Sequence, residues 1–169
     1  MTKTLILMRH AKSAWDDPLL DDHERSLNDR GRRSADAVGT WLSAQRHLPD
    51  TVLSSTARRT RETWEGLAPH LPAPERVIWT RDLYLASSMR LLKVLQRSEG
   101  RTILLLGHNE GIGEAASLLV RTPPKHPRFL QYPTAAVTVM RFDIDDWAAA
   151  IWGAGEVVDF IVPRDLGVA

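Results

Sequence analysis

The sequence predicts an α/β protein, built as a three-layer α/β/α sandwich around a mainly parallel central sheet. Short apolar segments alternate along the chain with segments of helical periodicity, which is typical of repeated strand–helix–strand units. The segment Ile103–Leu106 is apolar at every position, as expected of a parallel strand that is buried on both faces. The 169 residues, 43% of them hydrophobic, suffice for one sizeable core, so we expect a single domain over residues 1–169.

The first part of the chain predicts two strand–helix units. Thr4–Arg9 form a strand, and Asn28 is a suitable N-cap for a helix that ends at about Ala44. A second strand covers Thr51–Ser54, and we expect Thr56 to cap the helix that follows. The positions at helical spacing that we expect to face the sheet are Ala35, Val38, Trp41 and Leu42 in the first helix and Thr60, Trp64 and Leu67 in the second.

The rest of the chain continues this alternation and ends in strands. Two proline-bearing segments, residues 69–74 and 123–127, are expected to be loops. Residues 135–142 alternate in polarity and contain β-branched side chains, so they and the last strand are expected to complete the sheet towards an edge. The expected elements are strands at residues 77–79, 101–106, 135–142 and 157–162, and helices at residues 88–96 and 111–119.

Composition narrows the range of functions. The 22 Lys and Arg residues against 21 Asp and Glu leave a formal net charge of +1, so we expect neither nucleic acid nor a membrane surface as a partner. The chain has no Cys, which excludes disulfides, thiolate metal sites and a cysteine nucleophile. Met1–Thr4 lead directly into the first strand without a signal sequence, so we expect a cytoplasmic protein.

Polar residues that suit phosphate chemistry follow three of the expected strands. Arg9-His10 ends the first strand, Arg59 lies in the first turn of the helix after the second strand, and Gly107-His108 follows Ile103–Leu106. In open α/β sheets, ligands bind beyond the carboxyl ends of the strands, so we expect these side chains to converge. The first turn of a helix adds exposed backbone N–H groups and a dipole that favours an anion.

Two arginines and two histidines at one place predict an anion site with a nucleophile. Guanidinium groups match phosphate oxygens in a bidentate geometry, and a neutral imidazole has one free lone pair that can attack phosphorus. Such a nucleophile needs a backbone carbonyl or a carboxylate to accept the proton on its other nitrogen. We expect no metal, because the sequence contains neither a His-x-x-x-His motif nor an Asp/Glu-rich ligand cluster.

These motifs resemble those of the histidine phosphatase superfamily. That family has an Arg-His-Gly after the first strand, an Arg in a Ser-Pro-x-x-Arg-x-x-x-Thr segment and a second His after a later strand. The segments at residues 9–13, 24–31 and 82–86 are most similar to the small phosphohistidine phosphatases of the SixA type. The resemblance implies a phosphoglycerate mutase-like fold, with His10 as the nucleophile and His108 as a second catalytic histidine. It also implies that Arg9 and Arg59 bind phosphate.

The resemblance implies further roles that leave alternatives open. Arg25 would be another phosphate contact, although a surface ion pair with Glu24 or Asp22 is an equal alternative. Asn109 would contact phosphate through its backbone. Larger family members take a general acid from a loop after the third strand, where Asp82 is the nearest candidate and an ordinary loop carboxylate is the alternative. A site without a strong acid favours N–P over O–P substrates, because an imidazole leaves more readily than a sugar hydroxyl.

The expected activity is hydrolysis of phosphohistidine on proteins, through a phosphohistidine intermediate at His10 and without metal or another cofactor. Short connections leave the site open to a phosphorylated protein, such as a phosphotransfer protein. Two alternatives stay open: a phosphatase for small esters such as sugar or nucleotide phosphates, and a phosphoprotein-binding module with little catalysis. The presence of His10 argues against the binding module, because binding alone requires arginines and no nucleophile.

Overall fold

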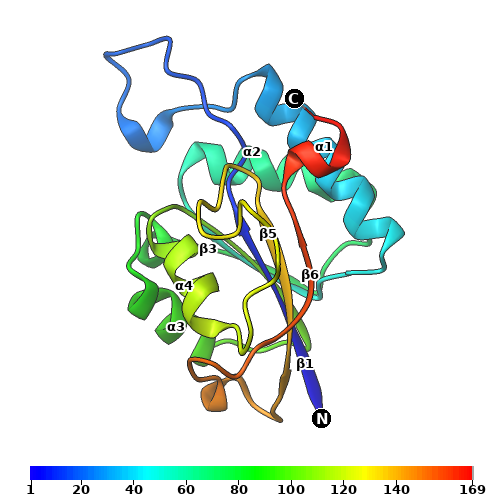
Figure 1. Cartoon of the computed structure of the whole chain (residues 1–169). Helices are drawn as coiled ribbons and strands as arrows, with labels where there is room; N and C mark the ends of the chain where they lie inside the picture. Colours follow the sequence, from blue (N-terminus) through cyan, green and yellow to red (C-terminus); the bar gives the residue numbers. More distant parts are fainter. Residues whose placement is uncertain (169) are drawn as a thin grey trace.

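The computed structural model describes residues 1–168 and contains a six-stranded sheet with helices on both faces (Figure 1). The strands are β1 (Thr2–Arg9), β2 (Thr51–Ser55), β3 (Arg76–Thr80), β4 (Thr102–Gly107), β5 (Val137–Asp143) and β6 (Glu156–Ile161). The α-helices are α1 (Asp29–Ala44), α2 (Arg58–Leu67), α3 (Ser88–Gln96) and α4 (Gly111–Leu119). Short 3-10 turns are η1 (Asp22–Glu24), η2 (Ala68–His70), η3 (Arg81–Leu83), η4 (Trp147–Ala149) and η5 (Pro163–Leu166).

The sheet is mainly parallel, which confirms the prediction. Its strand order is β3-β2-β4-β1-β5-β6. The first four strands in this order pair in parallel, whereas β5 runs antiparallel to both β1 and β6. The carboxyl ends of β1, β2 and β4 therefore lie at one edge of the sheet, which is where the polar motifs of the sequence occur.

Side chains that alternate along the strands build two apolar cores, one on each face of the sheet. Leu5 and Leu7 of β1 pack in the core with α3 and α4, whereas Ile6 and Met8 pack with α1 and α2. The same alternation holds along β4. The two helix pairs thus form the outer layers of the three-layer α/β/α sandwich that the sequence predicts (Figure 1).

The starts of α1 and α2 differ in how they are capped. Asn28 caps α1 as predicted, because its side chain accepts a 2.8 Å hydrogen bond from the Gly31 amide. The prediction that Thr56 caps α2 is wrong, since the N-cap position is Ala57. The Thr56 hydroxyl is instead bonded to Nε2 of His23 at 2.8 Å. The prediction used only the residue type of Thr56, but its hydroxyl is bonded to His23 in the distant connection between β1 and α1.

The predicted strands and helices are otherwise confirmed to within about two residues at each end. A long connection, residues 10–28, leaves the sheet after β1 and extends away from the body of the molecule before α1 begins (Figure 1). In the described part of the chain, no helix combines the length and the hydropathy that crossing a bilayer requires.

Candidate active site

The carboxyl ends of β1 and β4 bring two histidines together. The parallel register pairs Arg9 with Gly107, so the residues that follow, His10 and His108, leave the sheet side by side. The His10 amide donates a 3.1 Å hydrogen bond to the Gly107 carbonyl, and the two imidazole rings are 5.3 Å apart between centroids. Both rings are buried, with 6% and 2% of their residues' surfaces exposed.

The hydrogen bonds of His10 determine which of its nitrogens is free. Its Nδ1 lies 2.7 Å from the Ala11 carbonyl oxygen, which can only accept, so Nδ1 carries the proton. Nε2 of the neutral ring then keeps its lone pair. Burial is the main cause that lowers the pKa of His10 well below its ordinary value, and the positive charges of Arg59 and Arg9 act in the same direction.

His108 is also neutral in this arrangement. Its Nε2 lies 2.8 Å from the Ser55 hydroxyl oxygen, which in turn accepts the Ala57 amide at 3.2 Å. Burial, followed by the charge of Arg59, lowers the pKa of His108 to about 3. The end of β2 therefore orients this histidine beside the nucleophile candidate.

Arg59, which is buried, and Arg9, which is partly buried, supply two positive charges. Nη1 of Arg9 donates to the Tyr132 carbonyl at 3.1 Å. Nη1 of Arg59 donates to the Asp22 carbonyl at 2.8 Å, and its Nη2 donates to the Asp22 carboxylate at 3.1 Å. Within residues 1–168, the only buried side-chain nitrogens without a hydrogen-bond partner are Arg9 Nε, Arg59 Nε and His108 Nδ1. Unpaired buried groups are rare in folded proteins, and their concentration here is typical of a ligand site.

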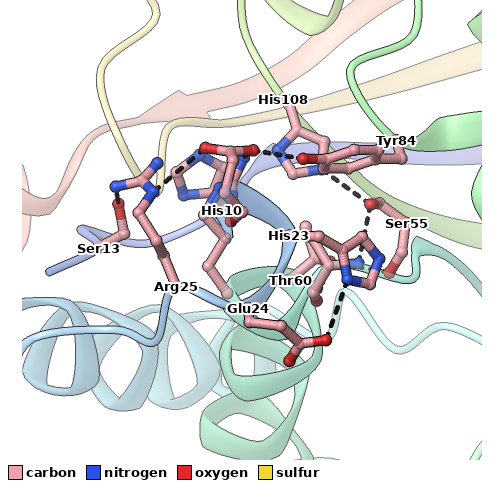
Figure 2. A network of polar contacts seen from close by, with 12 residues as sticks. His10, Ser13, His23, Glu24, Arg25, Ser55, Thr60, Tyr84 and His108 are labelled. Carbon is pink, nitrogen blue, oxygen red and sulfur yellow. Dashed lines mark hydrogen bonds and ion pairs between the residues drawn. The ribbon is translucent and has the colours of Figure 1, made fainter. Parts of the chain in front are cut away.

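Arg25 joins this cluster through Asp22. Its Nε donates to the Asp22 carboxylate at 3.2 Å and its Nη1 to the Ser13 hydroxyl at 2.9 Å (Figure 2). The guanidinium also stacks on the exposed ring of Trp15, 3.5 Å from its centroid. The ion pair between Arg25 and Asp22 that the sequence allows is therefore present. The same carboxylate also pairs with Arg59, so Asp22 links the two arginines.

Asp22 and Tyr84 lie in the cluster although the sequence did not identify them as site residues. The Asp22 carboxylate accepts hydrogen bonds from Arg59, Arg25 and the Tyr84 hydroxyl. Burial opposes its ionisation, but these donors outweigh burial and lower the pKa of Asp22 to about 2. The Tyr84 ring also lies edge-on to His108, with centroids 5.5 Å apart (Figure 2).

Asp82 lies outside the cluster. It is exposed at the start of η3, its carboxylate is 3.7 Å from Nη1 of Arg90, and it lines a cavity of about 310 Å³ beside α3. Tyr84, two residues later, occupies the place beside His108 instead. Asp82 lies within η3 and is exposed, whereas Tyr84 lies in the extended backbone that follows η3 and is partly buried.

Asn109 and His23 have supporting positions. Asn109 donates from Nδ2 to the Tyr132 carbonyl at 3.1 Å and accepts the Gly113 amide at 3.1 Å, so its side chain fastens the start of α4 to the carbonyl that also holds Arg9. His23 packs edge-on against Tyr84, with centroids 4.9 Å apart. In residues 1–168, the structure contains no group of three or more His, Asp or Glu side chains arranged to hold a metal ion.

Comparisons with known proteins agree with the fold and with the motifs. Residues 5–83 match the family model of the histidine phosphatase superfamily (branch 1). The Mycobacterium tuberculosis protein Rv1276c is 33% identical over 164 residues, which cover 93% of this chain and all of that protein. A chloroplastic protein of Arabidopsis thaliana, At3g52155, is 35% identical over 130 residues, or 70% of this chain. The matched region spans only 60% of the length of that protein.

Solved structures extend the similarity to nearly the whole chain. The SixA protein of Nakamurella multipartitia superimposes with a TM-score of 0.82 at 27% identity, covering 96% of this chain and 97% of that one. The SixA protein of Agrobacterium tumefaciens gives a TM-score of 0.78 at 25% identity, covering 95% and 98%. The motif residues, the sheet topology and these similarities lead to one conclusion: the chain belongs to the histidine phosphatase superfamily and has its phosphoglycerate mutase-like fold.

Proposed function

We propose that this protein is a phosphatase that removes phosphoryl groups from histidine side chains of other proteins. The observation that carries the proposal is the 2.7 Å hydrogen bond between Nδ1 of His10 and the Ala11 carbonyl, in a ring that two arginines flank. In the first step, the lone pair of His10 Nε2 forms a bond to phosphorus, and the bond to the substrate nitrogen breaks. In the second step, water attacks the phosphorylated His10 and releases inorganic phosphate.

The neighbouring cations would stabilise the transition state. Negative charge spreads over the equatorial oxygens of the transferring phosphoryl group. Arg9 and Arg59 carry fixed positive charges beside His10, and each has an Nε–H without a partner in the described residues. His108 would donate a hydrogen bond to the same oxygens, and Arg25 and the backbone of Asn109 would add outer contacts. Donors that are already oriented need little reorganisation when the charge develops.

A phosphorylated histidine suits this site better than a sugar phosphate does. An imidazole that is protonated on its far nitrogen leaves as a neutral molecule, whereas an alkoxide requires a general acid. Asp82, the candidate acid of the sequence, faces Arg90 outside the cluster, and Asp22 is held as an anion. The likeness to SixA proteins supports the same substrate class. A phosphotransfer protein would present such a histidine.

The test is release of phosphate from a protein that carries phosphohistidine, with EDTA present. The wild type is expected to release phosphate in EDTA and to be inhibited by vanadate, whereas His10→Ala is expected to be inactive. His70→Ala is the matched control, because His70 pairs with Asp36 outside the cluster. A requirement for added divalent metal would contradict the metal-free step, and a substrate that stays phosphorylated would direct attention to small phosphate esters.

A further inference from the structure

The solvent side of the cluster is formed by Asp22 and Tyr84. His10, His108 and Arg59 are almost fully buried. The Asp22 side chain is 43% exposed while its carboxylate accepts from Nη2 of Arg59. Asp22 therefore stands between the buried guanidinium and solvent, with the Tyr84 hydroxyl bonded to it.

The direction of phosphoryl transfer places the leaving group on the solvent side of the cluster. The nucleophile and the leaving group lie on opposite sides of phosphorus in an in-line displacement. Because His10 is buried, a substrate must approach from solvent with phosphorus towards the histidine. The leaving group of the substrate then faces outward, towards the half-exposed carboxylate of Asp22.

Arg59 and Arg25 keep unused N–H donors for a phosphate while both are bonded to Asp22. The contacts with Asp22 use one N–H on Nη1 and one on Nη2 of Arg59. The Nε–H and a second N–H on each terminal nitrogen of Arg59 are not used by Asp22. Arg25 uses Nε for Asp22 and Nη1 for Ser13 and Ala14, so its Nη2 is likewise without a bond to these residues. Three donors, two of them cationic, hold the carboxylate as an anion.

We propose that Asp22 selects the leaving group by charge. Its carboxylate favours a leaving group that carries positive charge, such as a phosphorylated imidazole protonated on its far nitrogen. It disfavours a leaving oxygen that gains negative charge. This inference rests on the proposed function and assigns the preference for N–P bonds to one residue.

The proton and electron balance of the step agrees with this assignment. The lone pair of His10 Nε2 forms the new N–P bond, and the electron pair of the broken P–N bond returns to the substrate ring. Because that ring already carries its proton, it departs as neutral imidazole and needs no acid. With a phosphate ester, the electron pair leaves on oxygen, and the negative charge develops beside the Asp22 carboxylate. Since kcat/KM compares the transition state with free substrate, the two substrates should respond oppositely to this charge.

The experiment compares two substrates in the wild type, Asp22→Asn and Asp21→Asn. One substrate is a phosphohistidine peptide, and the other is p-nitrophenyl phosphate, whose leaving group departs as an anion without requiring an acid. The quantity compared is kcat/KM for the phosphohistidine peptide divided by kcat/KM for p-nitrophenyl phosphate. We expect Asp22→Asn to lower this ratio by about tenfold or more, which corresponds to about 1.4 kcal/mol. Asp21→Asn makes the same charge change at the adjacent exposed position, and we expect it to leave the ratio unchanged.

Two outcomes would overturn the inference. Equal losses on both substrates would mean that Asp22 only orients Arg59 and Arg25, and an unchanged ratio would mean that its charge does not act on the leaving group. Asp22→Ala provides a second variant at the same half-exposed turn and must shift the ratio in the same direction. Failure of the proposed function is distinguishable, because it would appear as a wild type that is inactive on phosphohistidine.

Discussion

The guanidinium of Arg9 is held by the backbone carbonyl of Tyr132, to which its Nη1 donates a hydrogen bond of 3.1 Å. The Tyr132 hydroxyl donates to the Leu7 carbonyl at 2.8 Å and is bonded to the Thr138 hydroxyl at the same distance. Leu7 precedes Arg9 by two residues in β1. One fully buried side chain therefore anchors both the central strand and the segment that orients the arginine at its end.

Removing this hydroxyl is expected to lower stability more than activity. Tyr132→Phe leaves the Leu7 carbonyl and the Thr138 hydroxyl without this partner, which should lower the free energy of unfolding by about 1–3 kcal/mol. The carbonyl that binds Arg9 remains, so kcat/KM should stay near the wild-type value. Urea denaturation and phosphatase assays on the same preparation measure the two effects. An unchanged denaturation midpoint would show that the hydroxyl does not stabilise the fold.

Arg59 is expected to require its guanidinium as well as its charge. Arg59→Lys keeps the positive charge but loses the planar set of N–H groups that binds Asp22 and, in the proposed mechanism, would bind phosphate as well. We therefore expect the rate to fall by about 10²- to 10³-fold. Arg58→Lys is the matched control, because Arg58 is exposed and pairs with Glu62. Comparable losses in both variants would contradict the special role of Arg59. Steady-state kinetics and vanadate inhibition provide the comparison.

The protein is expected to become less stable as the pH falls below about 6.5. A histidine in the unfolded chain binds a proton near that pH, whereas burial lowers the pKa of folded His108 to about 3. The unfolded state therefore binds more protons over this range, and the free energy of unfolding decreases on acidification. His108 alone should contribute about 2 kcal/mol between about pH 6.5 and pH 5.

His10 adds to this loss in the same direction, because burial lowers its pKa well below the ordinary value too. Urea denaturation at several pH values gives the slope of the free energy of unfolding against pH for the wild type. The slope should be smaller in His108→Gln, which has no titrating ring at this position. Equal slopes in the two proteins would show that His108 binds its proton as readily when folded as when unfolded.

A tight backbone contact beside the site is expected to tolerate no side chain. A Cβ at Gly111 would lie 1.8 Å from the Ala86 carbonyl oxygen, so the start of α4 would have to shift. We expect Gly111→Ala to cost about 3 kcal/mol or more. Gly153→Ala is the control, since its Cβ would meet nothing within 4 Å and only the φ of +76° imposes strain, about 1 kcal/mol. Thermal unfolding of both variants should reveal the difference.

The sequence predicts the inner part of the site better than its rim. His10, Arg9 and His108 follow apolar strands directly, so the parallel register alone brings them to one edge. Asp22 and Tyr84 come from loops whose course depends on contacts between distant segments, such as the hydrogen bond that joins them across 62 positions. No local pattern in the sequence predicts that Asp22 and Tyr84 are in contact. A carboxylate such as Asp82 resembles a general acid in sequence, but in the structure it lies at the surface within η3, beside Arg90.

The central position of β1 also determines when the site can form. This strand is synthesised before the others, yet its two partners in the sheet are β4 and β5, which begin at Thr102 and Val137. Contacts between such distant segments form slowly, because a long loop must close before they gain free energy. During translation, a chain that already exposes His10 would therefore lack both His108 and the carbonyl that orients Arg9. The site can therefore form only after the chain has been synthesised through β4 and β5.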